Sequence, residues 1–265
     1  MKSLNGTDII DFHKKEIMPF VMKHSLSRLL YASLRRFFDI VFSVCILLLT
    51  LPLMIIIAII IMIDSPGSPI FKQIRIGIDR RHDKGRRIRK SSVPDTSSEK
   101  RSVCRRNKDL LGMHFFVFYK FRTMKHNARE LYPELYKYEF SGEEISKFHF
   151  KKTDDPRLTR FGRLLRKTSL DELPNFINVI KGDMNIVGPR PEIPEMIKYY
   201  TREQRKKFTV NPGITCFAQI NGRGDLSFQE TLKEDLAYVK QASFLLDLKI
   251  ILKTIYVMIT RRGAF

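Results

Sequence analysis

The sequence predicts a mixed α/β protein that is mainly helical and has a small β element. Three observations predict this fold class: one long apolar run near the N-terminus, two strand-like runs at 70–78 and 115–119, and a helical periodicity from Phe121 onward. Turns containing Pro or Gly interrupt that periodicity, for example at Asp155-Pro156 and at Asn221-Gly222. The chain of 265 residues is long enough to bury a core.

The apolar run indicates a membrane protein. From Ile40 to Ile63 the chain has 24 consecutive residues without a charge or a histidine. As a helix this run would be about 36 Å long, compared with about 30 Å for the hydrocarbon core of a bilayer. It is followed by the turn residues 64–67 rather than by a small-residue cleavage site, so we do not interpret it as a signal peptide.

Two features favour a re-entrant helix over a spanning one. Pro52 lies near the centre of the run, where a bend is expected, and each half would then reach only about 18 Å, roughly one leaflet. The flanking basic residues are equal in number under the positive-inside rule, with Lys23, Arg28, Arg35 and Arg36 before the run and Lys72, Arg75, Arg80 and Arg81 after it. A hairpin that enters and leaves on the cytoplasmic face and a kinked spanning helix both remain open on these grounds.

Composition divides the chain into three parts. Residues 1–34 mix apolar and basic side chains, as in an amphipathic helix on an anionic membrane surface or a plain solvated helix. Residues 35–64 contain the membrane helix with its break near Pro52, and residues 65–265 form the main domain. Within that domain, residues 79–108 carry twelve Lys or Arg and four Asp or Glu, which predicts a flexible basic insertion.

The C-terminal residues 244–260 are predicted to form a helix. Apolar side chains recur there at helical spacing, and such a stripe packs either in the core or at a membrane interface. We expect core packing for this stripe, which consists of Leu245, Leu248, Leu252, Ile255, Tyr256 and Ile259.

Charge and cysteine content restrict the classes of function. The chain has 48 Lys and Arg and 28 Asp and Glu, a net charge of +20, so its natural partners are polyanions such as phosphate-bearing substrates or anionic membrane lipids. No recognition helix or aromatic RNA-binding strand is evident, so no nucleic acid is expected. Cys45, Cys104 and Cys216 lie far apart, which argues against a zinc module and a disulfide framework.

Acidic residues among many arginines mark the candidate chemistry at 151–192. Residues 169–172 match a capping box, in which Asp171 and Glu172 would only stabilise a helix N-terminus. Pro174 would disturb that helix, but it suits the first position of a helix that starts later. The two carboxylates would then lie just before a helix N-terminus, where phosphate also binds.

Such a pair can divide the work of phosphoryl transfer. One carboxylate acts as the nucleophile while the other holds a divalent cation, because Mg²⁺ is commonly bound through one or two carboxylates and substrate phosphates. A glycosidase is not expected, since its two carboxyl groups flank the substrate. The arginines that could neutralise a diphosphate are Arg160, Arg163, Arg166 and Arg190.

The run 155–192, with Thr168-Ser-Leu-Asp-Glu-Leu-Pro-Asn175 and Gly188-Pro-Arg-Pro-Glu192 at its centre, closely resembles the bacterial sugar transferase family. These are the monotopic polyprenyl-phosphate phosphoglycosyl transferases. The resemblance covers nearly everything from Arg35 onward apart from the insertion, with further matching motifs at 71–77, 119–124, 212–215, 218–223, 247–254 and 262–265.

The resemblance implies a covalent mechanism. Asp171 would attack the β-phosphate of a UDP-sugar, expel UMP and carry a phosphosugar, which polyprenyl (undecaprenyl) phosphate then accepts. It also implies Mg²⁺ or Mn²⁺ at Glu172 and Asp171. The matching cations for substrate phosphates are Lys120, Arg122, Arg166 and Arg190, and the motif residues whose roles are less defined are Asp183, Glu192, Asn175 and Arg223.

The resemblance further implies a location and a pathway step. It implies a re-entrant helix broken at Pro52, amphipathic interfacial helices, and a catalytic domain on the cytoplasmic face of a bacterial inner membrane, where it initiates surface glycan synthesis. Departures from the family pattern at Asn175, Asn185 and Cys216-Phe217 leave the sugar open. The alternative is a non-catalytic basic membrane-surface adaptor or polyanion-binding protein, and homodimer formation is also left open.

Overall fold

The computed structural model of the protein describes residues 25–79, 112–149, 155–222 and 225–260. Nearly all of the predicted basic insertion, most of the predicted N-terminal segment and Arg223 lie outside these residues. The chain divides into two units, residues 1–37 and 38–265. The described part of the first unit is helical, and the described strands all lie in the second unit.

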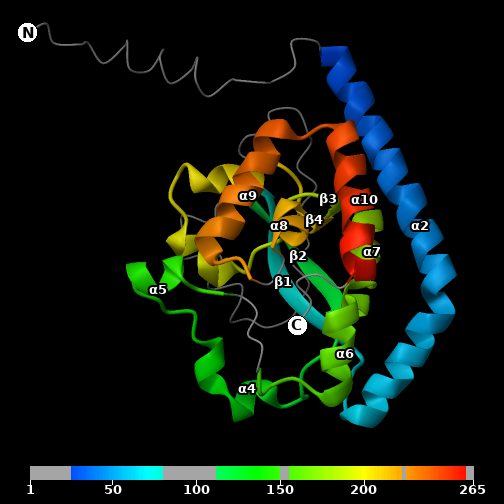
Figure 1. Ribbon diagram of the computed structural model, residues 1–265, viewed down its shortest axis with the longest axis vertical. Coiled ribbons are helices and arrows are strands. Elements are labelled where there is room, and N and C mark those ends of the chain that lie inside the picture. Colours follow the sequence, from blue (N-terminus) through cyan, green and yellow to red (C-terminus); the bar gives the residue numbers. More distant parts are fainter. Residues whose placement is uncertain (1–24, 80–111, 150–154, 223–224, 261–265) are drawn as a thin grey trace, which may run out of the picture. The chain divides into compact units, whose positions relative to one another are not determined.

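Helix α2 (Ser25–Asp64) contains the whole apolar run, which confirms the predicted helix. Pro52 lies inside α2, and the helix bends in its light-blue stretch but continues (Figure 1). This agrees with the bend expected at a proline, and the re-entrant break near Pro52 stays a prediction. Residues 31–64 are long and apolar enough to cross a membrane.

The predicted β element is an antiparallel hairpin of β1 (Ile70–Asp79) and β2 (Met113–Phe121). Side chains alternate along β2, so that Phe115 packs in one hydrophobic cluster while Phe116 and Phe118 pack in another. The hairpin lies at the centre of the helices (Figure 1) and has a helical layer against each face. Both strand predictions are confirmed.

The other elements are short helices and a second, two-stranded parallel sheet in which β3 pairs with β4. In chain order they are α4 (Ala128–Leu131), η3 (Pro133–Tyr136), α5 (Gly142–Ser146), α6 (Arg160–Thr168), η4 (Leu170–Glu172), α7 (Asn175–Lys181), β3 (Asn185–Val187), η5 (Pro194–Tyr199), η6 (Gln204–Thr209), β4 (Gly213–Thr215), α8 (Phe217–Asn221), α9 (Phe228–Gln241) and α10 (Phe244–Thr260).

Helix α2 is attached to this domain along one face. Ile57 and Ile61 are buried in a cluster with Phe121 and Leu165, at the end of β2 and on α6. Nearer the N-terminus, Phe38 of α2 lies edge-on to Phe244 of α10, with 5.9 Å between the ring centroids, and Phe42 packs near α7. The apolar helix is thus packed against the same domain that carries the candidate site.

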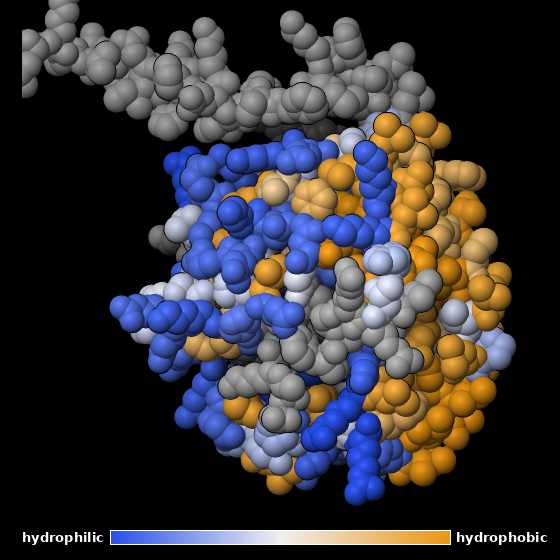
Figure 2. Space-filling model, in the orientation of Figure 1, coloured by the Kyte–Doolittle hydropathy of each residue, from blue (hydrophilic) through white to orange (hydrophobic). Residues whose placement is uncertain are grey.

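Helix α10 has the predicted bounds, but its buried side is not the one predicted. Its buried side chains include Asp247, Ile250 and Ile251, whereas Leu245 and Leu252 of the predicted core stripe are 72% and 60% exposed. The expectation of core packing for that stripe was wrong, because both sides of α10 are apolar and helical spacing alone does not identify the inner one. Figure 2 shows apolar side chains gathered along the edge where α2 and α10 run.

A close backbone contact holds α6 against the end of β2. A Cβ atom added at Gly162 would lie 2.0 Å from the carbonyl oxygen of Thr123, so only glycine fits there. At Gly142, on α5, an added Cβ would meet nothing within 4 Å. The α6 contact therefore depends on the absence of a side chain at residue 162.

We expect Gly162→Ala to lower the free energy of unfolding by about 1–3 kcal/mol, because α6 must move away from Thr123. The matched control is Gly142→Ala, which should leave stability unchanged or slightly higher. Thermal unfolding of the two purified variants beside wild type measures the difference. Equal melting temperatures for both variants would contradict the contact.

Candidate active site

The chain between α6 and α7 presents two adjacent acidic residues. Helix α6 begins with the Thr159 hydroxyl accepting a hydrogen bond from the Gly162 N–H at 2.9 Å, and it ends at Ser169, whose φ of 58° turns the chain sharply. Asp171 and Glu172 then form a single 3-10 turn, and Pro174 precedes α7. The Ser169 side chain makes no capping hydrogen bond, so the capping-box interpretation was wrong and the later helix start is confirmed.

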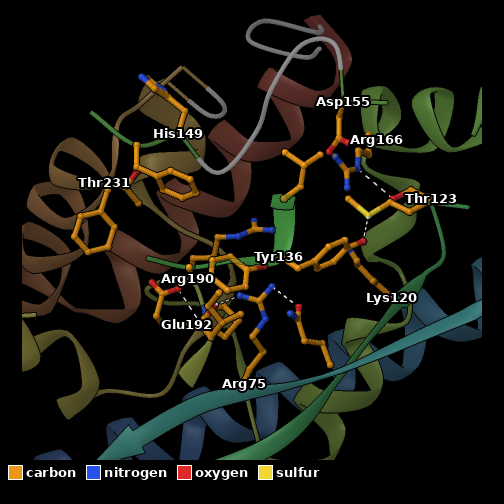
Figure 3. Close-up of a pocket in the computed structure, with 18 of the residues that line it drawn as sticks. Arg75, Lys120, Thr123, Tyr136, His149, Asp155, Arg166, Arg190, Glu192 and Thr231 are labelled. Carbon is orange, nitrogen blue, oxygen red and sulfur yellow. Dashed lines mark hydrogen bonds and ion pairs between the residues drawn. The ribbon is translucent and has the colours of Figure 1, made fainter. Parts of the chain in front are cut away.

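The two acids line a cavity of about 710 Å³, within the usual range for a small-molecule site. Asp171 is 7% exposed. The cavity brings together residues from both ends of the domain, and Figure 3 shows Asp155, Arg166 and Thr123 on one side and His149 and Thr231 on the other. Of the residues predicted from sequence, those that line it are Lys120, Arg122, Arg166, Asp171, Glu172, Arg190 and Glu192.

Lys120, on β2, and Arg166, on α6, both interact electrostatically with Asp171. Burial and the nearby Arg166 lower the pKa of Lys120 to about 7, although the Asp171 carboxylate opposes this shift. Burial also lowers the pKa of Arg166, whose charge Asp171 favours. Repulsion between the two cations is the reason a bound polyanion would be stabilising here.

Arg166 is held in place by Thr123 and Asp155. Its Nε donates to the Thr123 hydroxyl at 3.1 Å, and its guanidinium lies 3.9 Å from the Asp155 carboxylate. Asp155 also binds Arg157 through two hydrogen bonds, of 2.8 and 2.7 Å. Burial alone would raise the pKa of Asp155, but the bonds from Arg157 keep it below its ordinary value. Asp155 therefore stays charged and orients Arg166.

Arg190 contacts the second acid of the pair. Its guanidinium lies 3.3 Å from a Glu172 carboxylate oxygen. Burial would lower the pKa of Arg190, but Glu172 and other nearby groups raise it above its ordinary value. Arg75, on β1, also lines the cavity and donates to the Pro191 carbonyl at 3.1 Å, and burial lowers its pKa to about 10. The 188–192 segment is thus fixed to the hairpin.

A buried ion cluster lies beyond Arg190. The Tyr200 hydroxyl donates to the Glu192 carboxylate at 2.6 Å, and Lys207 donates to that hydroxyl at 3.1 Å. The Lys207 ammonium also pairs with Glu192 at 3.5 Å and with Asp235, on α9, at 3.1 Å. Glu192, predicted only as a motif acid, is therefore part of a paired group in which each charge has a partner.

The remaining predicted residues have other surroundings. The Arg122 guanidinium donates to the carbonyls of Ser65 and Pro66 just after α2, so it holds the end of that helix even though it borders the cavity. Asp183 follows α7 and accepts from the Asn178 amide at 3.3 Å. Asn175 is 1% exposed at the start of α7. Arg223 lies outside the described residues.

Several cavity residues were missed by sequence reasoning. Lys207 and Tyr200 line the cavity, and Asp235 is the buried partner of Lys207. No spacing in the sequence relates these residues to Glu192. Arg75 lies in a strand whose motif resembles the family, which is the one signal that could have identified it. Apart from that signal, only the tertiary structure brings these side chains together.

No ready-made metal centre is present among the described residues, since no three His, Cys, Asp or Glu side chains gather there. Asp171 and Glu172 instead offer two adjacent carboxylates next to several cations. Such a set suits Mg²⁺ held jointly by protein and substrate phosphates, rather than by a protein cage.

Comparison with known proteins gives one consistent result. The chain is 32% identical over 262 residues to a UDP-galactose-lipid carrier transferase of Erwinia amylovora. It is also 32% identical over 262 residues to an undecaprenyl-phosphate galactose phosphotransferase of Salmonella typhimurium. Each alignment covers 99% of this chain and 48% of the relative. It is 33% identical over 242 residues to an undecaprenyl-phosphate glucose phosphotransferase of Komagataeibacter xylinus, with 87% of this chain and 37% of that protein covered.

The chain thus spans about half the length of the first two relatives and less than that of the third. A family model described as bacterial sugar transferase matches residues 30–110 and 96–261, which include the apolar part of α2, the hairpin and the whole candidate site. The resemblance carried by the motifs is confirmed, and the chain belongs to the bacterial sugar transferase family.

Proposed function

We propose that this protein moves a phosphosugar from a UDP-sugar to polyprenyl phosphate, undecaprenyl phosphate in bacteria, and releases UMP. One observation carries the proposal: two adjacent carboxylates share a cavity with cations from three separate parts of the chain, Lys120, Arg166 and Arg190. A diphosphate ester supplies the negative charge that these cations need, and a carboxylate can attack its phosphorus.

The reaction would proceed in two displacements. An Asp171 carboxylate oxygen bonds to the β-phosphorus, and the bond from that phosphorus to the oxygen bridging the α-phosphate breaks, so UMP leaves with the electron pair. A phosphate oxygen of the polyprenyl phosphate then bonds to the same phosphorus, and the Asp171 oxygen leaves. Lys120, Arg166 and Arg190 neutralise the charge that develops on the phosphoryl oxygens in both steps.

Glu172 and Asp171 would hold Mg²⁺, or Mn²⁺, together with the donor phosphates. When bound, the cation supplies Lewis-acid stabilisation of the leaving phosphate. Within the protein, the 3.3 Å contact with Arg190 fixes the Glu172 side chain next to Asp171.

The acceptor would reach the site from the membrane. Exposed apolar side chains flank the acidic turn, with Leu164 of α6 before it and Ile177 of α7 after it, and α2 and α10 add further apolar surface. A lipid-linked phosphate can therefore lie with its chain on this surface and its phosphate toward the cations. We propose that α2 re-enters the cytoplasmic face of the inner membrane, where anionic lipids would also attract the basic chain.

The weaker alternative is a non-catalytic adaptor that binds membranes or polyanions through its positive charge alone. Such a protein needs accessible cations, whereas Arg166 is 17% exposed in its side chain and is already paired with Asp155. It also has no use for a pair of carboxylates that line a cavity. The proposed role is therefore catalytic, and by the motif resemblance it would be the initiating step of surface glycan synthesis.

We expect Asp171→Asn to reduce UMP release from UDP-sugars by at least about a thousand-fold, because the amide is not a nucleophile. The matched control is Asp225→Asn, at an exposed acid outside the cavity lining, which should retain wild-type turnover. Assays contain Mg²⁺ and undecaprenyl phosphate, and sedimentation with membranes checks attachment. Wild-type UMP release by Asp171→Asn would rule out the nucleophile, as would the lack of any phosphosugar adduct on wild type in intact-mass measurement without acceptor.

The pKa of Lys120 predicts a pH dependence for donor capture. Because its pKa is about 7, the ammonium that would bind phosphate is present below that pH and is lost above it. We therefore expect kcat/KM for the UDP-sugar to fall as pH rises through about 7. Lys120→Met should have a low kcat/KM without this fall. A decline of the same shape in wild type and Lys120→Met would assign it to another group.

Cysteine labelling tests the re-entrant topology. In a variant with Cys45, Cys104 and Cys216 replaced by Ser, single cysteines are introduced by Ser27→Cys or Ser68→Cys, one before and one after the apolar run. We expect a membrane-impermeant maleimide to label neither site in intact spheroplasts and both after lysis. Labelling of one site only in intact spheroplasts would mean that α2 spans the membrane.

A further inference from the structure

The cavity has an open end and an enclosed end. At the open end, Glu134 and Lys137 are exposed, and the Leu135 carbonyl accepts a hydrogen bond from Arg157 beside Asp155. At the enclosed end, Glu192 and Lys207 are only 4% and 3% exposed. Figure 3 shows the Asp155 side and the Glu192 side on opposite flanks of the cavity.

The enclosed end offers fixed polar groups next to apolar ones. The Glu192, Tyr200, Lys207 and Asp235 cluster is held by contacts of 2.6 to 3.5 Å, so its atoms cannot rearrange freely. Phe228, fully buried, lines the same end and provides an aromatic face. Rigid donors and acceptors beside an apolar surface suit a ligand with several hydroxyls and a ring of C–H groups.

Two further polar side chains line the cavity without belonging to the ion cluster. Thr231 lies one helical turn after Phe228. The Gln219 N–H donates to the carbonyl of Cys216, whose thiol interacts with Asp235 and Lys207. Gln219 lies on α8 and Thr231 on α9, and both are half-buried. Helices α8 and α9 pack against each other, so the two side chains come from adjacent elements. Replacing Gln219 or Thr231 therefore removes no partner from the charges of Glu192, Lys207 or Asp235.

The order of the proposed reaction decides which part of the donor belongs at each end. UMP must leave before the acceptor phosphate attacks, so the nucleotide needs a path to solvent. The sugar stays attached to Asp171 through its phosphate during that exchange, so it can remain in place until the acceptor has attacked and leaves only with the lipid-linked product. The enclosed end therefore suits the sugar, and the open end suits the nucleotide.

We propose that the enclosed end of the cavity binds the sugar ring of the donor and that Gln219 and Thr231 determine which sugar is accepted. This inference rests on the proposed function. A sugar with a hydroxyl in the wrong orientation would leave polar groups here without partners, and unpaired buried polar groups are strongly disfavoured. Arg190 lies next to this end, so the sugar phosphate would remain against Glu172 and Asp171.

The experiment compares ligands with and without the sugar. The variants are Thr231→Val and Gln219→Met, and the matched control is Thr209→Val, at an exposed threonine outside the cavity lining. Calorimetry in nanodiscs with Mg²⁺ measures Kd for UDP in every protein. The Kd for UDP-glucose, UDP-galactose and UDP-N-acetylglucosamine is measured in the same proteins carrying Asp171→Asn, because an intact Asp171 would consume these donors. UMP release by the proteins with Asp171 intact gives kcat/KM for the three sugars.

We expect each variant to bind the preferred UDP-sugar about five- to tenfold more weakly, as for loss of one hydrogen bond, while the Kd for UDP changes less than about twofold. The ratio of kcat/KM values among the three sugars should change with it, and Thr209→Val should match wild type throughout.

Two results would overturn the inference while leaving the proposed function intact. Equal weakening of UDP and UDP-sugar binding would place the nucleotide at the enclosed end. Unchanged affinities and an unchanged sugar ratio in both variants would mean that neither side chain contacts the sugar. Binding of neither UDP to wild type nor any of the UDP-sugars to Asp171→Asn would instead refute the proposed function and this inference together.

Discussion

The placement of the acidic pair among cations is the constraint on which the rest of the structure depends. Asp171 and Glu172 occupy a single 3-10 turn, and the cations around them come from β2, α6 and the segment after β3. Cations gathered in a partly desolvated cavity repel one another unless negative charge lies between them. The two carboxylates supply part of that charge, which leaves the cavity suited to a ligand that brings the remainder.

The scaffold keeps this arrangement through side-chain contacts that fix Arg166 and Arg190. Thr123 and Asp155 hold Arg166, Glu172 holds Arg190, and Arg75 ties the 188–192 segment to the hairpin. The contact at Gly162 brings α6 close enough to β2 for the Arg166 bond to form. Preorganised groups of this kind lower the cost of stabilising charge in a transition state, since they need not move when the charge develops.

The apolar surface and the cavity belong to one domain. Helix α2 packs against β2 and α6 through Ile57 and Ile61, and α10 exposes Leu245 and Leu252 on the side away from Ile250. A soluble protein rarely exposes so much apolar surface, so this edge of the molecule is suited to lipid. The proposed transfer from a water-soluble donor to a lipid-linked acceptor needs both surfaces close together. The acidic turn lies between α6 and α7, each of which exposes a large apolar side chain.

Local patterns in the sequence were sufficient to predict several of the helices and strands. The apolar run, the two strands and the helix at 244–260 were correctly predicted, because hydrophobic periodicity and the absence of charge act over a few turns of chain. Pro174 correctly indicated a helix that starts after the acidic pair. The motif resemblance identified the family and most of the cavity-lining charges.

Only the tertiary structure decided which face of each element is buried and which distant residues meet. The stripe on α10 was assigned to the core, yet Leu245 and Leu252 are exposed, because a helix apolar on both sides has no preferred inner face until its neighbours are in place. Pro52 bends α2 without ending it, and Arg122 binds the carbonyls at the end of α2. Glu192, Tyr200, Lys207 and Asp235 form one ion cluster although they come from different segments, and Asp235 lies on α9. No local pattern encodes that meeting, because it results from the packing of separate helices around the hairpin.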